Sequence, residues 1–215
     1  MSLKVNEIFY SIQGESSYAG LPCVFVRLTG CNLRCSYCDT RYAYEDGRDM
    51  KIGEIIDRVV SYQCRLVEIT GGEPLFQKET PLLITTLLEN GFHVLLETNG
   101  SQDIGSVDER CVKIIDIKCP SSGEHEQNDS GNVQRLTGRD EIKFVMGTRE
   151  DYDYAKKMVE HMRQVAAKAN IIHFSPIFGK MNPRQLADWI LADRLTVRLH
   201  VQLHKIVWDP EQRGV

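Results

Sequence analysis

The sequence lacks any long hydrophobic run and any excess of positive charge. No segment of its 215 residues approaches the roughly 20 consecutive apolar residues that a membrane-spanning helix needs. The formal net charge is -4, with 26 Lys and Arg against 30 Asp and Glu, whereas domains that bind nucleic acid usually carry a basic face. The composition therefore argues against a membrane or nucleic-acid partner and favours a small molecule.

The start of the chain also lacks the pattern of a secretory signal, which is a basic segment, an apolar run and a small-residue cleavage site. We therefore expect a cytoplasmic protein. Structural disulfides are rare in that reducing compartment, and the seven cysteines cannot all pair because their number is odd. Metal ligation or burial is the expected use of these thiols.

Short β-branched runs alternate with amphipathic stretches, which is typical of βα units around a parallel sheet. The expected strands are 23–28, 66–69, 94–96, 112–117, 142–145 and 171–174. The expected helices are 52–60, 81–89, 150–167 and 183–191. These elements predict one α/β domain, either an open doubly wound sheet or an incomplete barrel. In both folds the reactive site lies at the carboxyl ends of the strands.

Polar residues mark the expected helix starts and one long loop. Thr80 and Asn182 each precede a first-turn proline and are expected N-caps, while Thr148 and Asp151 have the spacing of a capping box. The stretch 120–137 is rich in Ser, Gly, Asn and Asp, which predicts a long loop or a mobile insertion.

Three cysteines, Cys31, Cys35 and Cys38, fall within eight residues directly after an expected strand. Thiolates hold iron-sulfur clusters, and three of them leave one iron of a four-iron cubane open. A catalytic metal site needs such an open position, because water or substrate binds the metal there. A zinc site with a fourth ligand from elsewhere is the alternative, although zinc sites more often show paired Cys-x-x-Cys motifs. The remaining cysteines lack metal-ligand neighbours and are expected to pack in the core: Cys23, Cys64, Cys111 and Cys119.

The spacing C-x3-C-x2-C, with Tyr37 before the last cysteine, resembles the signature of the radical S-adenosylmethionine (SAM) superfamily. The resemblance implies a [4Fe-4S] cluster whose open iron binds the methionine part of SAM and whose electron splits SAM to a 5′-deoxyadenosyl radical. Thr70-Gly71-Gly72-Glu73-Pro74 resembles the motif that binds the SAM amino group. Tyr37, Gly72 and Glu73 are therefore expected at SAM.

Later strand ends supply further candidates for SAM contacts. Lys118 and Ser121 follow the expected strand 112–117, and Ser175 follows the strand 171–174. Cofactors need polar partners on convergent loops, so we interpret these three side chains as SAM contacts. The alternative is that they form turns or helix caps.

The two ends of the chain are similar to one family. Ser11-Ile12-Gln13-Gly14-Glu15-Ser16, the stretch from Ala19 to Thr40 and the closing Gln202-Leu203-His204-Lys205 resemble the 7-carboxy-7-deazaguanine synthase family. The resemblance implies ring contraction of 6-carboxy-5,6,7,8-tetrahydropterin to 7-carboxy-7-deazaguanine with loss of ammonia, on the route to preQ0 and queuosine. It also implies Mg²⁺ besides SAM and the cluster, a homodimer, and a flavodoxin- or ferredoxin-like electron donor.

The same resemblance implies a partial (βα)6 TIM-like barrel of the radical SAM type. Residues 1–215 form one domain in this interpretation, with an N-terminal substrate-binding segment and a C-terminal tail that closes the site. Thr40 matches the Mg²⁺-binding hydroxyl. The residues that match substrate contacts are Ile12, Gln13, Gly14, Glu15, Arg27, Thr70 and His204. No side chain is assigned as a catalytic acid, base or nucleophile.

Two other functions compete with this one. An activating enzyme for a glycyl-radical protein shares the cysteine spacing but acts on a protein loop. A zinc-binding module without catalysis would use the cysteines for structure. Whether the carboxylate of Val215 contacts the substrate is left open.

Overall fold

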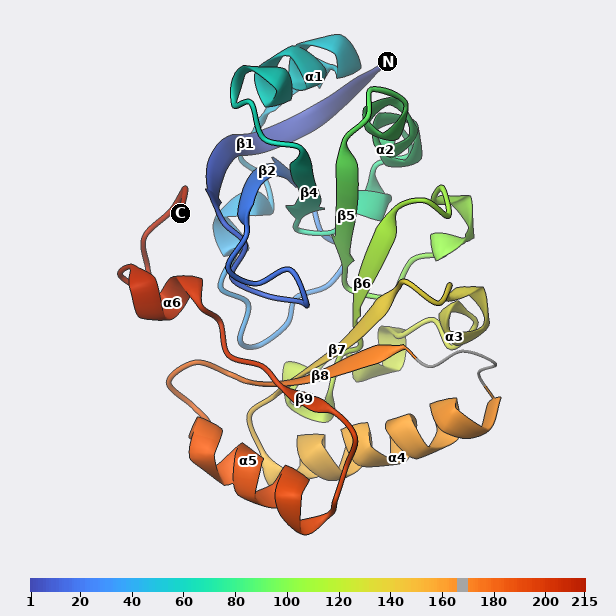
Figure 1. Cartoon of the computed structure of the whole chain (residues 1–215), viewed down its shortest axis with the longest axis vertical. Helices are drawn as coiled ribbons and strands as arrows, with labels where there is room; N and C mark the ends of the chain where they lie inside the picture. Colours follow the sequence, from blue (N-terminus) through green and yellow to red (C-terminus); the bar gives the residue numbers. More distant parts are fainter. Residues whose placement is uncertain (166–169) are drawn as a thin grey trace.

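The computed structural model describes residues 1–165 and 170–215, which build one nine-stranded sheet (Figure 1). The strands are β1 (Ser2–Ile12), β2 (Pro22–Leu28), β3 (Arg48–Lys51), β4 (Leu66–Gly71), β5 (His93–Thr98), β6 (Val112–Asp116), β7 (Glu141–Met146), β8 (Ile171–Pro176) and β9 (Arg198–Leu199). The α-helices are α1 (Ile52–Ser61), α2 (Thr80–Glu89), α3 (Asn132–Arg135), α4 (Arg149–Val165), α5 (Pro183–Ala192) and α6 (His204–Val207).

The order of the strands identifies the fold. The sheet runs β3-β1-β2-β4-β5-β6-β7-β8-β9, and every pair from β2 to β9 is parallel, while β1 is antiparallel to both β2 and β3. In a doubly wound sheet the order reverses at a switch point. Here each parallel strand lies beside the next parallel strand of the chain, as in a (βα) barrel. The sheet ends at β3 and β9, so the barrel is partial, as the resemblance implied.

All six expected strands are present, within a few residues of their expected ends. The sequence analysis missed β1, β3 and β9. Residues 9–12 come before the first expected strand, 23–28, but they are the end of β1. The six expected strands are largely buried and therefore continuously apolar. β1 carries charged residues along a partly exposed edge of the fold, so it lacks that signal.

The four expected helices are present as α1, α2, α4 and α5, although residues 166 and 167 of the third expectation lie outside the described residues. Asn182 caps α5 by accepting from the Arg184 backbone N–H at 2.9 Å. Thr80 is not a cap, because it is the first residue of α2 and its hydroxyl donates to the Pro74 carbonyl at 2.6 Å.

The Thr148 and Asp151 side chains each accept a hydrogen bond from the other residue's backbone N–H, which confirms the capping box at the start of α4. Asp151 also accepts from the Ser121 backbone N–H at 2.8 Å. The start of this helix is therefore tied to the segment that follows β6.

The segment 120–137, which was expected to be a long loop or a mobile insertion, contains short helices and buried anchors. It folds into two 3-10 turns, Pro120–Ser122 and His125–Gln127, followed by α3. Asn132 is buried, and its side chain accepts from the Ile104 backbone N–H and donates to the carbonyls of Gly100 and Gln102. Polar anchors such as Asn132 hold this segment together with the apolar Leu136 and Val133, which pack in the second core cluster, and the many polar residues are why its composition resembles that of a loop.

The apolar core surrounds the barrel and also closes the end at which the parallel strands start. One cluster packs α1 and α2 against β1, β2, β4 and β5, and a second packs α4 and α5 against β6, β7 and β8. A third, small cluster of Leu95, Val112 and Ile114, with Leu66 and Tyr18 beside it, lies inside the barrel near the starts of the strands. The open interior is therefore at the carboxyl ends of the strands.

Replacement of Asn182 by alanine should lower the free energy of unfolding by about 1 kcal/mol, because the Arg184 N–H loses its cap. Urea unfolding followed by circular dichroism measures this change. The Asn182→Ser variant keeps an acceptor and should retain most of the stability. Equal losses in both variants would contradict a capping role.

Candidate active site

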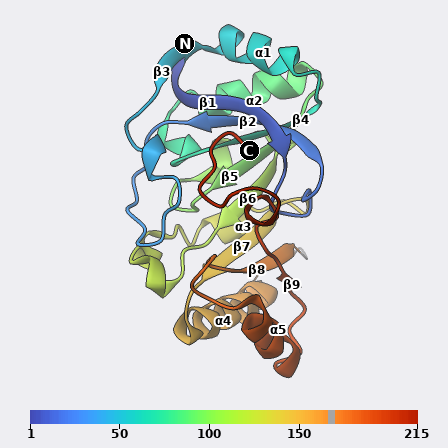
Figure 2. The same ribbon diagram turned by 90° about the vertical axis from the view of Figure 1, so that its left-hand side faces the viewer.

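A cavity of about 770 Å³ opens at the carboxyl ends of the parallel strands. Its walls come from the end of β1, the cysteine loop, the ends of β4 to β7 and the C-terminal tail. In Figure 2 the tail, in dark red, passes in front of β5 and β6. This volume lies within the range of small-molecule sites.

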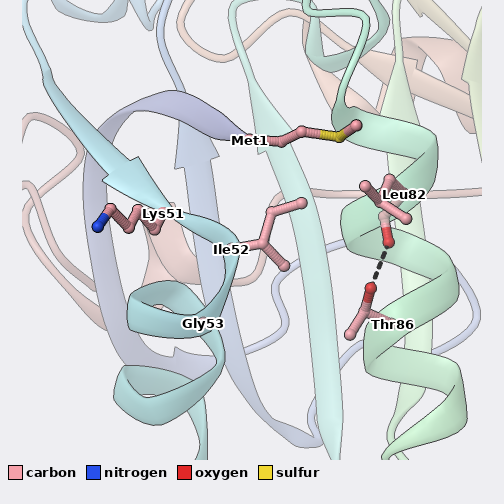
Figure 3. Close-up of a pocket in the computed structure, with 6 residues that line it drawn as sticks. All are labelled: Met1, Lys51, Ile52, Gly53, Leu82 and Thr86. Atoms are coloured by element: carbon pink, nitrogen blue, oxygen red, sulfur yellow. Dashed lines mark hydrogen bonds between the residues drawn. The ribbon is translucent and has the colours of Figure 1, made fainter.

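A smaller hollow of about 390 Å³ lies between the first residue, the start of α1 and the side of α2 (Figure 3). It is lined by Met1, Lys51, Ile52, Gly53, Leu82 and Thr86. None of the residues expected at a site belongs to it. The larger cavity is therefore the candidate site.

The three cysteines of the motif all line this cavity, together with Tyr37. Their loop starts at Gly30, whose φ of +99° is in the left-handed region that favours glycine. Gly72 packs directly under the loop, since a Cβ on it would lie 2.3 Å from the Gly30 carbonyl oxygen and 2.8 Å from the Cys31 Cβ. The two sequence motifs thus meet in space.

Burial raises the pKa of the thiols of Cys31 and Cys35, while the ammonium of Lys118 acts in the opposite direction. Iron would offset the cost of a desolvated thiolate at these positions, so the donor set fits a cluster. In the described part of the chain, no three His, Cys, Asp or Glu side chains are already arranged to hold a metal ion. The thiols share the cavity without forming a closed ligand set.

The expected SAM contacts divide into two groups. Tyr37, Gly72 and Lys118 line the cavity, and the Lys118 ammonium lies 2.8 Å from an Asp116 carboxylate oxygen. Ser121 and Ser175 are not among the lining residues: the Ser121 backbone N–H binds Asp151, and Ser175 is buried in β8.

Glu73 is fully buried and does not belong to the cavity wall. Its carboxylate accepts from the Leu75 N–H at 2.9 Å, the Thr98 hydroxyl at 2.9 Å and the Asn99 N–H at 2.7 Å. It therefore ties the turn after β4 to the end of β5. Contact of its side chain with SAM stays a prediction.

All seven residues expected at the substrate line the cavity. Gly14 lies against His204, where a Cβ would be 2.1 Å from the imidazole Nδ1, and its carbonyl accepts from the Leu203 N–H at 2.9 Å. Residues nearly 190 positions apart in the sequence thus share one wall. The Arg27 guanidinium also faces the cavity and binds Glu7 through Nε at 2.7 Å.

Thr40 lines the cavity beside Asp39, to which its hydroxyl donates at 3.0 Å. The Lys205 ammonium binds the other Asp39 oxygen at 2.6 Å, which ties the cysteine loop to α6. The tail continues along the cavity wall from Pro210 to Val215. The Thr40 and Asp39 oxygens and the last six residues of the chain therefore line the same cavity.

Sequence reasoning missed a group of charged residues inside the barrel, namely Glu68, Glu97, Asp116 and Lys143, all of which line the cavity. A signal was available, because Glu68 and Glu97 are the single acidic residues of β4 and β5, and Lys143 is followed by an apolar run in β7. Such residues face the interior only if the strands curve into a barrel. That curvature is not readable from each strand alone.

Lys143 is the cation at the centre of this group of charged residues. Its ammonium lies 2.7 Å from Glu15 and 2.5 Å from Glu97, and it is buried among them. These carboxylates hold the pKa of Lys143 well above its usual value, despite burial, which lowers it.

No helix in the described ranges is long and apolar enough to cross a bilayer.

The family model of the radical SAM superfamily matches residues 25–191. The chain is 49% identical to the 7-carboxy-7-deazaguanine synthase of Chlorobaculum tepidum, over 99% of this chain and 97% of that protein. It is 43% identical to the enzyme of the same name from Koribacter versatilis, over 99% and 100%. Among solved structures it superposes on QueE from Escherichia coli with a TM-score of 0.78, at 23% identity and covering 95% of both chains.

Proposed function

This chain belongs to the 7-carboxy-7-deazaguanine synthase family of radical SAM enzymes, and we propose that it converts 6-carboxy-5,6,7,8-tetrahydropterin to 7-carboxy-7-deazaguanine with release of ammonia. The product would enter the route to preQ0 and queuosine. As a member of this superfamily, it uses SAM and a [4Fe-4S] cluster.

One observation carries the proposal. Seven substrate positions inferred by resemblance, drawn from both ends of the chain and from β2 and β4, line one cavity with the three cysteines. A reaction between a cofactor and a small molecule requires both in the same enclosed space. The cavity provides that space, and the names of the relatives favour this function over a glycyl-radical activating enzyme or a zinc module.

Cys31, Cys35 and Cys38 would hold the cluster, and Tyr37, Gly72 and Lys118 would lie at SAM. When bound, these groups supply the radical chemistry. The protein binds and orients the pterin and excludes competing hydrogen donors. The C-terminal tail, which lines the cavity from Pro210 to Val215, would help to exclude these donors.

The substrate carboxylate would lie at Arg27, which has a planar guanidinium suited to carboxylates. Its Nε is bound to Glu7, and its guanidinium carbon lies 5.8 Å from the ring centroids of both Phe9 and Tyr42. Gln13 and Thr70 would bind polar edges of the heterocycle. Gly14 and His204 would form the wall against which the ring packs.

Mg²⁺ would bind near Thr40, because it prefers hard oxygen donors and keeps several water or substrate ligands. The Thr40 hydroxyl and the Asp39 carboxylate lie together at the cavity. A cation here would act as a Lewis acid and a template for oxygens of the substrate.

Replacement of Thr40 by alanine should raise the Mg²⁺ concentration needed for half-maximal turnover by about tenfold, the low end of effects from loss of a supporting group at a metal site. Iron content should not change. Titration of turnover with Mg²⁺ measures the shift, and Thr86→Ala, on the outer face of α2, is the control. A fall in iron content instead would identify Thr40 as a structural residue of the cysteine loop.

The assay that tests the function uses the cluster-loaded enzyme under anaerobic conditions with SAM, reductant, Mg²⁺ and the carboxypterin. Formation of the deazaguanine and of ammonia in equal amounts is the expected result. An enzyme that holds about four irons per chain and cleaves SAM, but forms no deazaguanine, would refute the proposed substrate. It would still agree with membership of the radical SAM superfamily.

The partners follow from the same family membership. A flavodoxin- or ferredoxin-like protein would deliver the electron, and the enzyme would act as a homodimer in the cytoplasm. Light scattering measures the oligomeric state. A monomer at working concentrations would contradict the dimer.

A further inference from the structure

The barrel interior holds more carboxylates than ammonium groups. Lys143 lies between Glu15, at 2.7 Å, and Glu97, at 2.5 Å. Asp116 forms its own pair with Lys118 at 2.8 Å and lies 4.0 Å from Lys143. Three carboxylates therefore surround two cations in this part of the wall.

A fourth carboxylate, Glu68, is buried in the same wall, and its donor is the Gln13 amide and not a cation. Four acids thus share two ammonium groups. An unpaired carboxylate in a poorly solvated interior is costly, and such groups take up a proton instead. Uptake of a proton by one of these carboxyl groups would relieve the excess of negative charge.

The hydrogen bonds decide which partner of Lys143 keeps its charge. Glu15 accepts from two donors, Lys143 on one oxygen and the Gln202 amide on the other at 2.8 Å. Within the described residues, the donor that reaches the Glu97 carboxylate is Lys143 alone. Because donors stabilise the ionised form, this arrangement favours the ionised form of Glu15 over that of Glu97.

The surrounding charges act in the same direction. Burial raises the pKa of Glu97 well above its usual value, and the neighbouring carboxylates of Glu15, Glu68 and Asp116 add to this effect while Lys143 opposes it. The pKa of Glu15 is lowered by Lys143, His204 and Gln202 in spite of its burial. The pKa of Glu68 is raised to about 7 by burial and by Glu15.

We propose that Glu97 is the acid that protonates the leaving nitrogen when the ring loses ammonia, and that Lys143 is a positioning residue that holds Glu97 beside Glu15. This role rests on the proposed function. Both carboxyl groups line the cavity, so Glu97 reaches a bound ring directly.

The step is an elimination that balances without an oxidant. The carbon–nitrogen bond breaks, its electron pair stays on nitrogen, and nitrogen takes the Glu97 proton and leaves as ammonia. The electron pair of the adjacent carbon–hydrogen bond becomes the new double bond of the five-membered ring. The proton from that bond returns to the Glu97 carboxylate, so the enzyme ends as it began.

Infrared spectroscopy of the cluster-loaded enzyme, without pterin, tests where the proton lies. At about pH 8, which is one unit above the raised pKa of Glu68, the wild type should show the carbonyl stretch of a protonated carboxylic acid. Glu97→Gln should lose this band, and the matched variant Glu68→Gln should keep it, because the Glu68 proton is largely lost at that pH. A wild type without the band, or a band that survives in Glu97→Gln, would overturn the proposal.

Kinetics test the role of the proton. Glu97→Gln should lower kcat for deazaguanine formation by about 10²- to 10⁴-fold, the usual contribution of an acid, with KM nearly unchanged. Lys143→Arg should retain the infrared band and more turnover than Lys143→Met. A Glu97→Gln enzyme with wild-type kcat would refute the acid role. If the wild type makes no deazaguanine, the substrate assignment fails, while the infrared result still locates the proton.

Discussion

The Cys35→Ala variant should retain its fold but lose all SAM cleavage and all turnover. Cys35 is one of three thiols on a loop that already lines the cavity, and two thiolates cannot hold a cubane that needs three protein ligands. Iron content should fall from about four per chain toward zero. Iron analysis, the visible absorption of the anaerobic protein and the yield of 5′-deoxyadenosine measure the three effects.

The matched control is Cys64→Ala. The Cys64 thiol is partly exposed, lies outside the cavity and donates only to the carbonyls of Pro22 and Leu66. This variant should bind iron and cleave SAM as the wild type does. Equal loss of iron in both variants would mean that instability, not ligation, explains the Cys35 result.

Gly72→Ala should reduce turnover by at least about a hundredfold, although it adds one methyl group. The new Cβ would lie 2.3 Å from the Gly30 carbonyl oxygen, 2.7 Å from its carbon and 2.8 Å from the Cys31 Cβ. Backbone cannot rotate away as a side chain does, so the cysteine loop must shift, and a displacement near 1 Å costs about 10²-fold in rate. Turnover per iron, measured after reconstitution, reports the effect.

Gly53→Ala provides the control, because a Cβ at Gly53 has no heavy atom within 4 Å. Gly53 is in the first turn of α1, where alanine is the better helix former by up to about 1 kcal/mol. This variant should therefore be as active as the wild type and slightly more stable. A Gly72→Ala enzyme with normal turnover would show that the cysteine loop does not depend on this contact.

The sequence predicted the parallel strands other than the two-residue β9, because burial on both faces leaves a largely apolar run that is visible locally. It predicted the four main helices for the same reason, through apolar residues at three- and four-residue spacing. It missed β1, which pairs with β2 on one side and β3 on the other but has the charged residues Lys4 and Glu7 in its sequence. It also misassigned Thr80, because the backbone of α2 begins one residue earlier than its proline suggests.

The pattern of strands and helices left the choice between a doubly wound sheet and a partial barrel open, and at the level of the sequence only the family resemblance implied the barrel. Both folds have the same alternation of strands and helices, and they differ only in which strands are neighbours. The hydrogen-bonded order from β2 to β9 decides for the barrel. Strand order is a property of long-range pairing, so no local pattern contains it.

The cysteine motif was recognisable because three ligands of one centre lie within eight residues, and a loop that short brings them together in almost any fold. The sequence therefore determined the metal chemistry and, through its two ends, the family. Only the tertiary structure decided which side chains complete the site. Glu15, Glu97 and Lys143 come from three distant segments and meet because the sheet curves. Their charges are set by that proximity and burial, which no segment has alone.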